Sequence, residues 1–93
     1  MTHPTNRLLL VVEATFLIRG TELAVLPGFR DEAGERFRIG DPVLLKRPEG
    51  SDLATTIGDL ARPTPNPNRV WLLWFNGLPK DDVPVGTEVW SMG

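Results

Sequence analysis

Two seven-residue stretches follow one pattern, and this pattern constrains the fold more than any other feature of the chain. Residues 37–43 (FRIGDPV) and 83–89 (VPVGTEV) both read apolar, any, apolar, glycine, polar, any, valine. In each stretch an extended arm leads into a turn at Gly40 or Gly86, a position that accepts positive φ, and a new strand follows. The pattern therefore predicts the corners of a small β-structure. Two copies are too few for a repeat architecture.

The composition is that of an ordinary globular protein. The 93 residues, 41% of them hydrophobic and 24% charged, fit one domain. There is no cysteine, so a disulfide or a thiolate metal site is impossible, which fits a cytoplasmic protein. The longest apolar run, Leu8–Val12, is too short to span a bilayer, and no membrane partner is expected. The net charge of −2 argues against wholesale nucleic-acid binding, for which a local basic patch would be needed.

Alternating apolar residues predict six or seven strands separated by glycine and proline turns. The first strand is expected to run unbroken over residues 8–18, because every second residue from Leu8 to Ile18 is apolar. A tight turn at Pro27 and Gly28 is expected to end the next strand. Residues 53–60 are assigned to a strand because three consecutive β-branched residues disfavour a helix, although a short helix capped by Asp52 is the alternative. The predicted strands are 8–18, Leu23–Leu26, Pro42–Leu45, 53–60, Val70–Phe75 and Glu88–Ser91.

The remaining segments are expected to connect these strands. Residues 1–7 are predicted to form a flexible leader and residues 31–36 an exposed loop. Residues 63–67 alternate proline with polar residues and predict a stiff, polyproline-like loop, whereas residues 78–82 suit one helical turn. Residues 8–93 then form a single all-β domain, a small barrel that is closed or nearly closed.

The order of these elements resembles the second domain of elongation factor Tu and related translational GTPases. After the long alternating strand, the resemblance is carried by residues 37–43, Val70–Leu73, Asn76–Leu78, Lys80–Val83 and 85–89. It covers Leu8 to Trp90 and implies an antiparallel Greek-key barrel of six or seven strands. No GTP binding is expected, because the chain has no phosphate-binding loop.

In elongation factor Tu, this domain helps to hold the 3′ end of aminoacyl-tRNA. Its pocket uses an acidic residue, an arginine three positions later, and an asparagine that enters the late apolar strand. Here Asp59 and Arg62 match the acid and the arginine, whereas Arg69 stands at the asparagine position. The resemblance thus implies an RNA-end site at these three residues. Two solvated arginines at the ends of the proline loop are the alternative.

The aromatic residues of the late apolar strand suggest a different surface. Trp71 and Trp74 lie on opposite faces of that strand, so they cannot both point into the core. The outward tryptophan, together with Phe75, is a candidate partner surface, and a homodimer built on Val70–Phe75 would use it too. The alternative is that the leader or the proline loop covers this tryptophan.

No catalytic, cofactor or metal site is expected. His3 is the only histidine, so a nucleophile would lack its usual base. Asp81 and Asp82 are expected to favour the positive end of the short helical turn rather than bind a cation. Asp41 and Thr87, which follow the two corner glycines, are expected to cap turn amides with their side chains.

The sequence is therefore consistent with two functions. The first is a non-catalytic binding module that engages a protein partner, either a different protein or a second copy of the chain. The second is translation-linked RNA binding through Asp59, Arg62 and Arg69.

Overall fold

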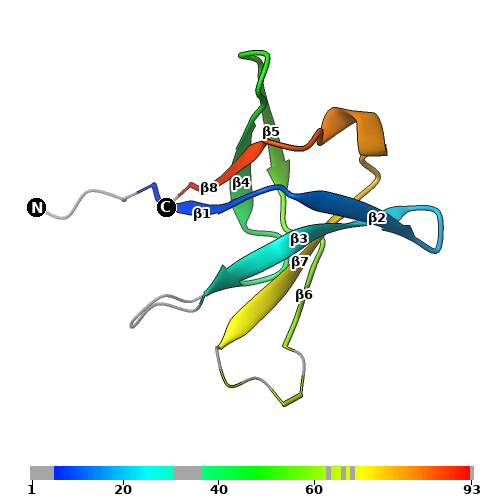
Figure 1. Cartoon of the computed structure of the whole chain (residues 1–93), viewed down its shortest axis with the longest axis vertical. Coiled ribbons are helices and arrows are strands. Elements are labelled where there is room, and N and C mark those ends of the chain that lie inside the picture. The colour runs from blue at the N-terminus through cyan, green and yellow to red at the C-terminus, as the bar shows by residue number, and fades with distance from the viewer. Residues whose placement is uncertain (1–5, 31–36, 63, 66, 68, 93) are drawn as a thin grey trace, which may run out of the picture.

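Regular structure in this protein is almost entirely β. The computed structural model describes residues 6–30, 37–62, 64, 65, 67 and 69–92. Figure 1 shows the arrangement of its elements. Within the described part the elements are β1 (Leu8–Val11), β2 (Ala14–Ile18), β3 (Glu22–Arg30), β4 (Pro42–Lys46), β5 (Asp52–Thr56), β6 (Asp59–Ala61), β7 (Val70–Asn76), the 3₁₀ helix η1 (Lys80–Asp82) and β8 (Glu88–Ser91).

The strands form two four-stranded antiparallel sheets. The first sheet has the order β1-β8-β4-β5 and the second the order β2-β3-β7-β6. If each strand of β1–β4 is replaced by the strand four places further along the chain, and the reverse, both sheet orders stay the same when read from the other end. The molecule therefore consists of two topologically equivalent halves, β1–β4 and β5–β8. The all-β prediction is confirmed at this level.

The prediction of one unbroken strand over residues 8–18 is wrong. The chain leaves the first sheet after β1 and enters the second sheet at β2, and this crossing reverses which side chains face inward. Val12 is buried at the crossing, but Thr15 rather than Phe16 faces the core further along. The apolar alternation continues across residues 12 and 13, so by itself it does not mark the change of sheet that reverses the inward-facing parity.

Residues 53–60 behave in the same way in the second half. They are extended, as predicted, but β5 belongs to the first sheet and β6 to the second. Ile57 lies buried between them, and the Gly58 N–H donates to the Trp74 carbonyl at 2.8 Å. A side chain on Gly58 would meet the Asn76 backbone nitrogen at 2.8 Å, which explains the glycine at this crossing.

The first corner turn, residues 38–41, holds the crossing in the second half. The Asp41 N–H donates to the Arg38 carbonyl at 3.1 Å, and Gly40 has a φ of +93° at the third turn position. Outside the turn, Gly40 N–H donates to the Ile57 carbonyl at 2.7 Å and Ile57 N–H donates to the Asp41 carbonyl at 2.9 Å. As predicted, the Asp41 carboxylate caps a turn amide, here the Arg38 N–H at 2.8 Å.

The second corner turn, residues 84–87, makes the equivalent contacts with the crossing in the first half. Thr87 N–H donates to the Pro84 carbonyl at 3.1 Å, and Gly86 has a φ of +95°. Gly86 N–H donates to the Val12 carbonyl and Val12 N–H to the Thr87 carbonyl, both at 2.8 Å. Thr87 was expected to cap an amide, but its hydroxyl donates to the Pro84 carbonyl at 2.7 Å instead. That expectation is wrong because proline has no N–H to be capped.

The prediction that Pro27 and Gly28 end a strand is also wrong. Both lie inside the nine-residue β3, where a β-bulge between Val25 and Phe29 shifts the pairing with β7. A side chain on Gly28 would stand 2.5 Å from the Trp71 carbonyl oxygen. The glycine thus permits close contact between two central strands, which is a common role for glycine at a bulge.

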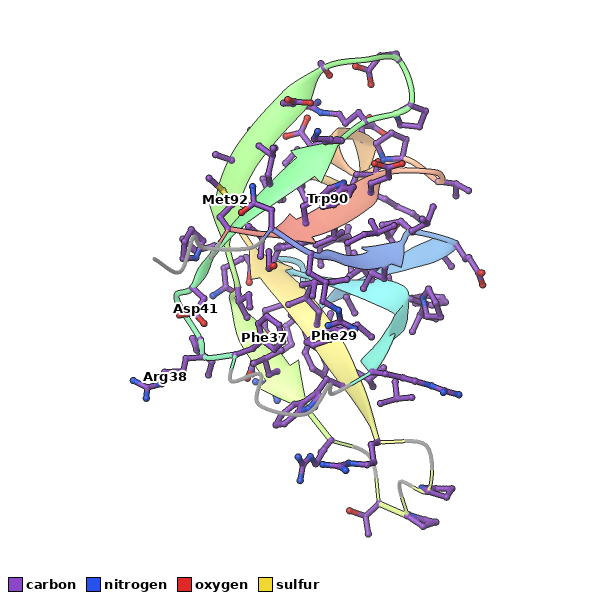
Figure 2. The ribbon with its side chains drawn as sticks, turned by 90° about the vertical axis from the view of Figure 1, so that its left-hand side faces the viewer. Phe29, Phe37, Arg38, Asp41, Trp90 and Met92 are labelled. Carbon is purple, nitrogen blue, oxygen red and sulfur yellow. The ribbon has the colours of Figure 1, made fainter. Side chains whose placement is uncertain are left out.

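The core lies between the two sheets and is made of aliphatic residues together with Phe29 and Phe75. At one end Phe29 and Phe37 meet edge to face, with ring centroids 5.1 Å apart (Figure 2). Arg7, assigned to a flexible leader, is instead fixed to β8. Its N–H donates to the Ser91 hydroxyl at 2.9 Å, and its carbonyl accepts from Ser91 N–H at 2.8 Å. The rest of the leader up to residue 5, the loop at 31–36 and Pro63 lie outside the described residues.

Candidate interaction surfaces

The arginines predicted to bind RNA lie at one end of the second sheet. Arg62 follows β6, and its guanidinium lies 4.5 Å from the centre of the Trp71 ring, a cation–π contact. Arg69 immediately precedes β7 and has a φ of +56°. Arg30, which the sequence reasoning did not single out, pairs with Val70 at the same end. Three cations therefore gather there, although the net charge of the chain is negative.

Asp59 is not part of this cluster. It pairs with Trp74 in the interior of the sheet, while Ala61 at the other end of β6 pairs with Leu72. Its carboxylate accepts the Leu60 N–H at 2.8 Å. The structure thus brings Arg62 and Arg69 together but leaves the acidic member of the predicted trio further along the strand.

The predicted aromatic surface is divided between the two faces of β7. Phe75 is fully buried in the core, so its assignment to a partner surface is wrong. Trp71 shares the inward side and packs partly buried against the core. Trp74 lies on the outer face and is half-buried; its indole N–H is enclosed and has no acceptor among the described residues. What Trp74 exposes to solvent is therefore apolar.

Trp74 belongs to an apolar row that crosses the second sheet. Phe16 on β2 pairs with Ala24 on β3, and Ala24 pairs with Trp74 on β7. Phe16 is 55% exposed, an unusual position for a phenylalanine. The remaining outward positions of these three strands are apolar except at the strand ends. We call this surface the outer apolar face; it comprises Phe16, Ile18, Ala24, Leu26, Leu72 and Trp74.

Phe16 was missed because one unbroken strand over residues 8–18 puts it on the same face as Leu10 and Val12, which are buried. One signal was available. Glu13 interrupts the apolar stretch at the crossing, and after a crossing the parity has to be assigned afresh.

The corresponding face of the first sheet also carries an apolar row, in which Leu8 pairs with Trp90, Trp90 with Leu44 and Leu44 with Ala54. Its tryptophan, Trp90, donates its indole N–H to the Glu88 carboxylate at 2.9 Å. The Lys46 ammonium lies 5.5 Å from the centre of the same ring. Leu8 and Leu44 pair with Trp90, whereas Ala24 and Asp59 pair with Trp74. The two tryptophans therefore differ in the polar contacts of their indole rings rather than in the apolar character of their cross-strand neighbours.

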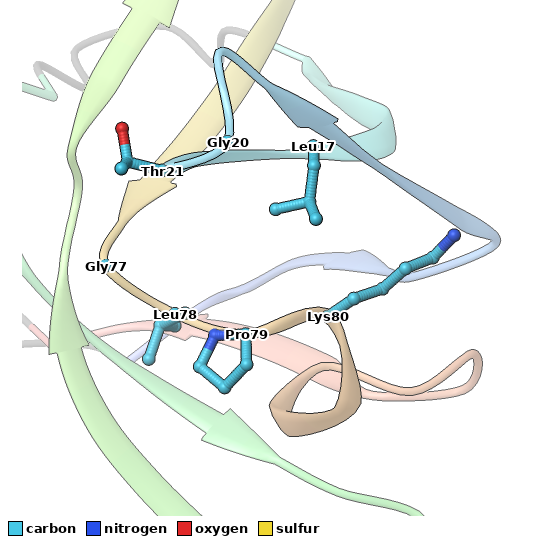
Figure 3. A pocket seen from close by; sticks show the side chains of 7 residues that line it. All are labelled: Leu17, Gly20, Thr21, Gly77, Leu78, Pro79 and Lys80. Carbon is cyan, nitrogen blue, oxygen red and sulfur yellow. The ribbon is translucent and has the colours of Figure 1, made fainter.

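A hollow of about 410 Å³ lies beside β2 (Figure 3). Leu17, 52% exposed, points into it from β2, opposite Leu78 and Pro79. The rest of its wall is formed by Gly20, Thr21, Gly77 and Lys80. Its lining is mainly apolar with one cation, so it offers no acid–base pair for catalysis.

Two further searches of the described residues are negative. No group of three or more histidine, cysteine, aspartate or glutamate side chains is arranged to hold a metal ion in this part of the chain. Nor does any helix among residues that the structure describes have the length and apolar character to cross a bilayer.

Comparison with known proteins gives no relative. No protein-family model matches the chain, and neither the curated proteins nor the solved structures include a match.

Proposed function

We propose that this protein is a non-catalytic interaction module that binds another protein through the outer apolar face. The observation that carries the proposal is the row Phe16–Ala24–Trp74, which presents apolar surface across three adjacent strands. Contiguous exposed apolar surface of this kind is typical of sites where proteins bind each other. Aromatic residues near the centre of such a surface contribute most to affinity.

The different polar contacts of the two tryptophan rings support this choice of face. Both outer faces carry a tryptophan, but Glu88 and Lys46 interact with Trp90. Among the described residues the Trp74 indole N–H has no hydrogen-bond acceptor, and Asp59 pairs with Trp74 at one end of the row. An apolar centre with a polar rim matches the usual anatomy of a protein interface.

We further propose that the fold is a Greek-key barrel of the type found in the second domain of elongation factor Tu. The support is the order of the sequence elements and the two corner turns, each of which joins the start of a strand to a sheet crossing. A nuclear magnetic resonance structure in solution tests this proposal. The strands described above form two sheets without a strand pair between them. Additional pairings in solution that close these sheets into one barrel would support the proposal, and their absence in solution would contradict it.

Affinity purification of the tagged protein from its host tests the binding function. Ala24→Glu places a charge in the centre of the outer apolar face without touching the core. Ile39→Glu is the matched control, because Ile39 is apolar, 65% exposed and located on the first corner turn. We expect a nuclease-resistant protein partner that the wild type and Ile39→Glu retain and Ala24→Glu loses. Titration with the purified partner should give at least a tenfold weaker affinity for Ala24→Glu, an effect of about 1.4 kcal/mol.

Equal recovery with Ala24→Glu and with the control would contradict binding through this face. Both variants are first compared with the wild type by circular dichroism and thermal unfolding, so that a folding defect is not mistaken for lost binding.

A second candidate function is binding of an RNA end, and the gathering of Arg30, Arg62 and Arg69 favours it. Bases would stack on the Trp71–Arg62 pair while the other arginines contact phosphates. In the same purification this function predicts recovered RNA that disappears after nuclease treatment. Binding should weaken steeply with salt and fall with Arg69→Glu, but it should be unchanged in Ala24→Glu.

A further inference from the structure

The outer apolar face is bounded by opposite charges at the two ends of β3. Glu22 begins this strand and Arg30 ends it. Both side chains lie on the outward side of the sheet, since the adjacent Leu23 and Phe29 are buried in the core. The outward positions between them belong to the outer apolar face. The strand therefore places an acid at one end of this face and a base at the other.

The first sheet arranges the charges of its outer face differently. Glu88 pairs with Lys46, and Lys46 pairs with Asp52, so acids and base are cross-strand neighbours. Opposite charges in such pairs stabilise each other within one chain. Glu22 and Arg30 pair with uncharged residues of β7 instead, and neither forms an ion pair with another residue that the structure describes. A second molecule can supply the missing opposite charges.

The outward residues of β7 define the spacing along the outer apolar face. Four of them occupy alternate positions and are evenly spaced along the strand: Asn76, Trp74, Leu72 and Val70. Pairing with β3 makes Glu22 level with the first of these residues and Arg30 level with the last. A two-fold axis that crosses the strands midway between Trp74 and Leu72 therefore exchanges the two ends of the face.

Rotation about this axis lays a second copy face to face on the first, with its strands antiparallel. Trp74 then lies over Leu72 of the second copy, and Glu22 lies over Arg30 of the second copy. Two-fold symmetry makes each of these contacts twice. Sheets that pack face to face keep their strands within about 30° of each other, and β3 and β7 are the central strands of this sheet (Figure 1). The correspondence therefore holds best at these two strands.

The charges distinguish this arrangement from the other way of stacking two copies. A two-fold axis that runs along the strands would place the Glu22 ends of both copies together and the Arg30 ends together. Like charges brought together at an interface oppose binding, whereas opposite charges favour it. The charges of β3 therefore favour the axis that crosses the strands.

We propose that the outer apolar face binds the same face of a second copy of this chain, in this antiparallel arrangement, to form an isologous dimer. This inference rests on the proposed function, because it names the protein that occupies the outer apolar face. The apolar residues form the centre of the interface, and the contacts between Glu22 and Arg30 lie at its rim. Phe16, 55% exposed in the single chain, then lies over Ala14 of the second copy, whose small side chain leaves room for the ring.

Such a dimer uses the strand that the sequence singled out, but through its side chains. Both edges of β7 are paired, one with β3 and the other with β6, so a dimer that adds a strand to β7 is excluded. The outward side of the same strand presents Trp74, whereas Phe75 points into the core.

Charge exchange at the rim tests the arrangement. Sedimentation equilibrium of the wild type should show a monomer–dimer equilibrium with a dissociation constant below about 1 mM, the weak end of specific association. Glu22→Arg and Arg30→Glu each turn two attractive contacts into repulsive ones, so each should weaken the dimer about tenfold or more. The double variant E22R/R30E restores both contacts and should return to within about threefold of the wild type. Arg38→Glu makes the same charge change on the first corner turn and should leave the equilibrium unchanged.

The two single variants also complement each other. When tagged Glu22→Arg is mixed with untagged Arg30→Glu, every contact at the rim is again between opposite charges. The mixture should therefore form a heterodimer, although neither variant dimerises well alone.

Ala24→Glu connects this test with that of the proposed function. It should abolish the dimer, because it places a charge in the centre of the interface, whereas Ile39→Glu should retain the dimer. Equal circular dichroism spectra and thermal unfolding confirm that all variants fold.

A wild type that stays monomeric at about 1 mM would overturn the dimer. So would a dimer that both single charge variants or Ala24→Glu retain, because the interface would then lie elsewhere, and so would a mixture that forms no heterodimer. A monomeric wild type from which Ala24→Glu removes a different protein in the affinity purification would refute the second copy and leave the proposed function standing. If Ala24→Glu changed neither the dimer nor the recovered proteins, both proposals would be wrong.

Discussion

The two corner turns have the same backbone arrangement but use different side chains after the glycine. In both, the glycine N–H and the carbonyl of the next residue hold the residue at a sheet crossing. The first turn places half-buried Asp41 there and the second places Thr87, which is fully buried. Figure 2 shows Arg38 and Asp41 on the outside of the first turn.

The residue at the start of each turn explains the difference. Arg38 has an N–H that needs an acceptor, and the carboxylate of Asp41 supplies it at 2.8 Å. Pro84 has no N–H, so only its carbonyl remains, and the Thr87 hydroxyl donates to it at 2.7 Å. The same turn conformation thus accommodates the charged Asp41 near the surface and the neutral Thr87 in the core. The comparison predicts that the two turns cannot exchange these side chains.

The exchange itself should show the largest effect. Thr87→Asp buries a carboxylate beside the Pro84 carbonyl, with no amide to accept from, and should lower the free energy of unfolding by at least about 3 kcal/mol. Asp41→Thr keeps an oxygen near Arg38 N–H and should cost less than about 0.5 kcal/mol. Urea denaturation of both variants measures the difference. Comparable losses in the two variants would show that burial does not distinguish the turns.

Replacing the two corner glycines should change the free energy of unfolding by amounts that differ less than those of the side-chain exchange. Gly40→Ala has open space around the new methyl group, so only the positive φ opposes it, and the cost should be about 1–2 kcal/mol. At Gly86 the methyl group would also meet the Pro48 side chain at 3.1 Å. Gly86→Ala should therefore cost about 1 kcal/mol more than Gly40→Ala in the same denaturation experiment. Replacing Pro48 by alanine in the Gly86→Ala background should remove this excess, whereas an unchanged excess would rule out the contact as its cause.

Removal of each capping side chain should have smaller effects. Thr87→Val deletes the buried hydroxyl but keeps the shape of the side chain, and the Pro84 carbonyl retains the Thr87 N–H. A loss of about 1 kcal/mol is expected. Asp41→Ala exposes the Arg38 N–H to water, which replaces the carboxylate, so about 0.5 kcal/mol is expected. If Asp41→Ala cost more than Thr87→Val, water would not be replacing the carboxylate at the Arg38 N–H.

The sequence was sufficient to predict local geometry at these turns. Glycine followed by a short polar residue and a strand residue indicated both corners, because positive φ and side-chain capping are decided by neighbouring residues. It also predicted strands rather than a helix at residues 53–60. It did not predict that Val12 and Ile57 are crossings, since which sheet a strand joins depends on long-range pairing.

Because the sheet to which each strand belongs could not be predicted, the surface residues were predicted only in part. Once the crossing at Val12 was missed, Phe16 was placed in the core, and the row that it forms with Ala24 and Trp74 could not be recognised. Phe75 was placed on the surface although the strand alternation pairs it with buried Leu73. The opposite faces of Trp71 and Trp74 were predicted correctly, because that relation depends only on spacing within one strand.

The turn between β4 and β5 links the two halves, and changes in this turn should have the smallest effect on the free energy of unfolding. In the tight turn after β4, the Glu49 carboxylate accepts from the hydroxyl and, at 3.0 Å, from the N–H of Ser51. The hydrogen bond from the Ser51 hydroxyl is the main cause that lowers the pKa of Glu49 below its ordinary value of 4.5. The folded state therefore gains stability from this carboxylate above pH 4.5, and loses it as the pH falls through the lowered folded-state pKa.

A nuclear magnetic resonance titration of the Glu49 side chain should give a midpoint below 4.5, and Ser51→Ala should move it upward. Because Glu49 is fully exposed, Glu49→Gln should change stability less than any turn variant and only above the folded-state pKa. A loss as large as that of Thr87→Val would mean that this link, rather than the corner turns alone, holds the two halves together.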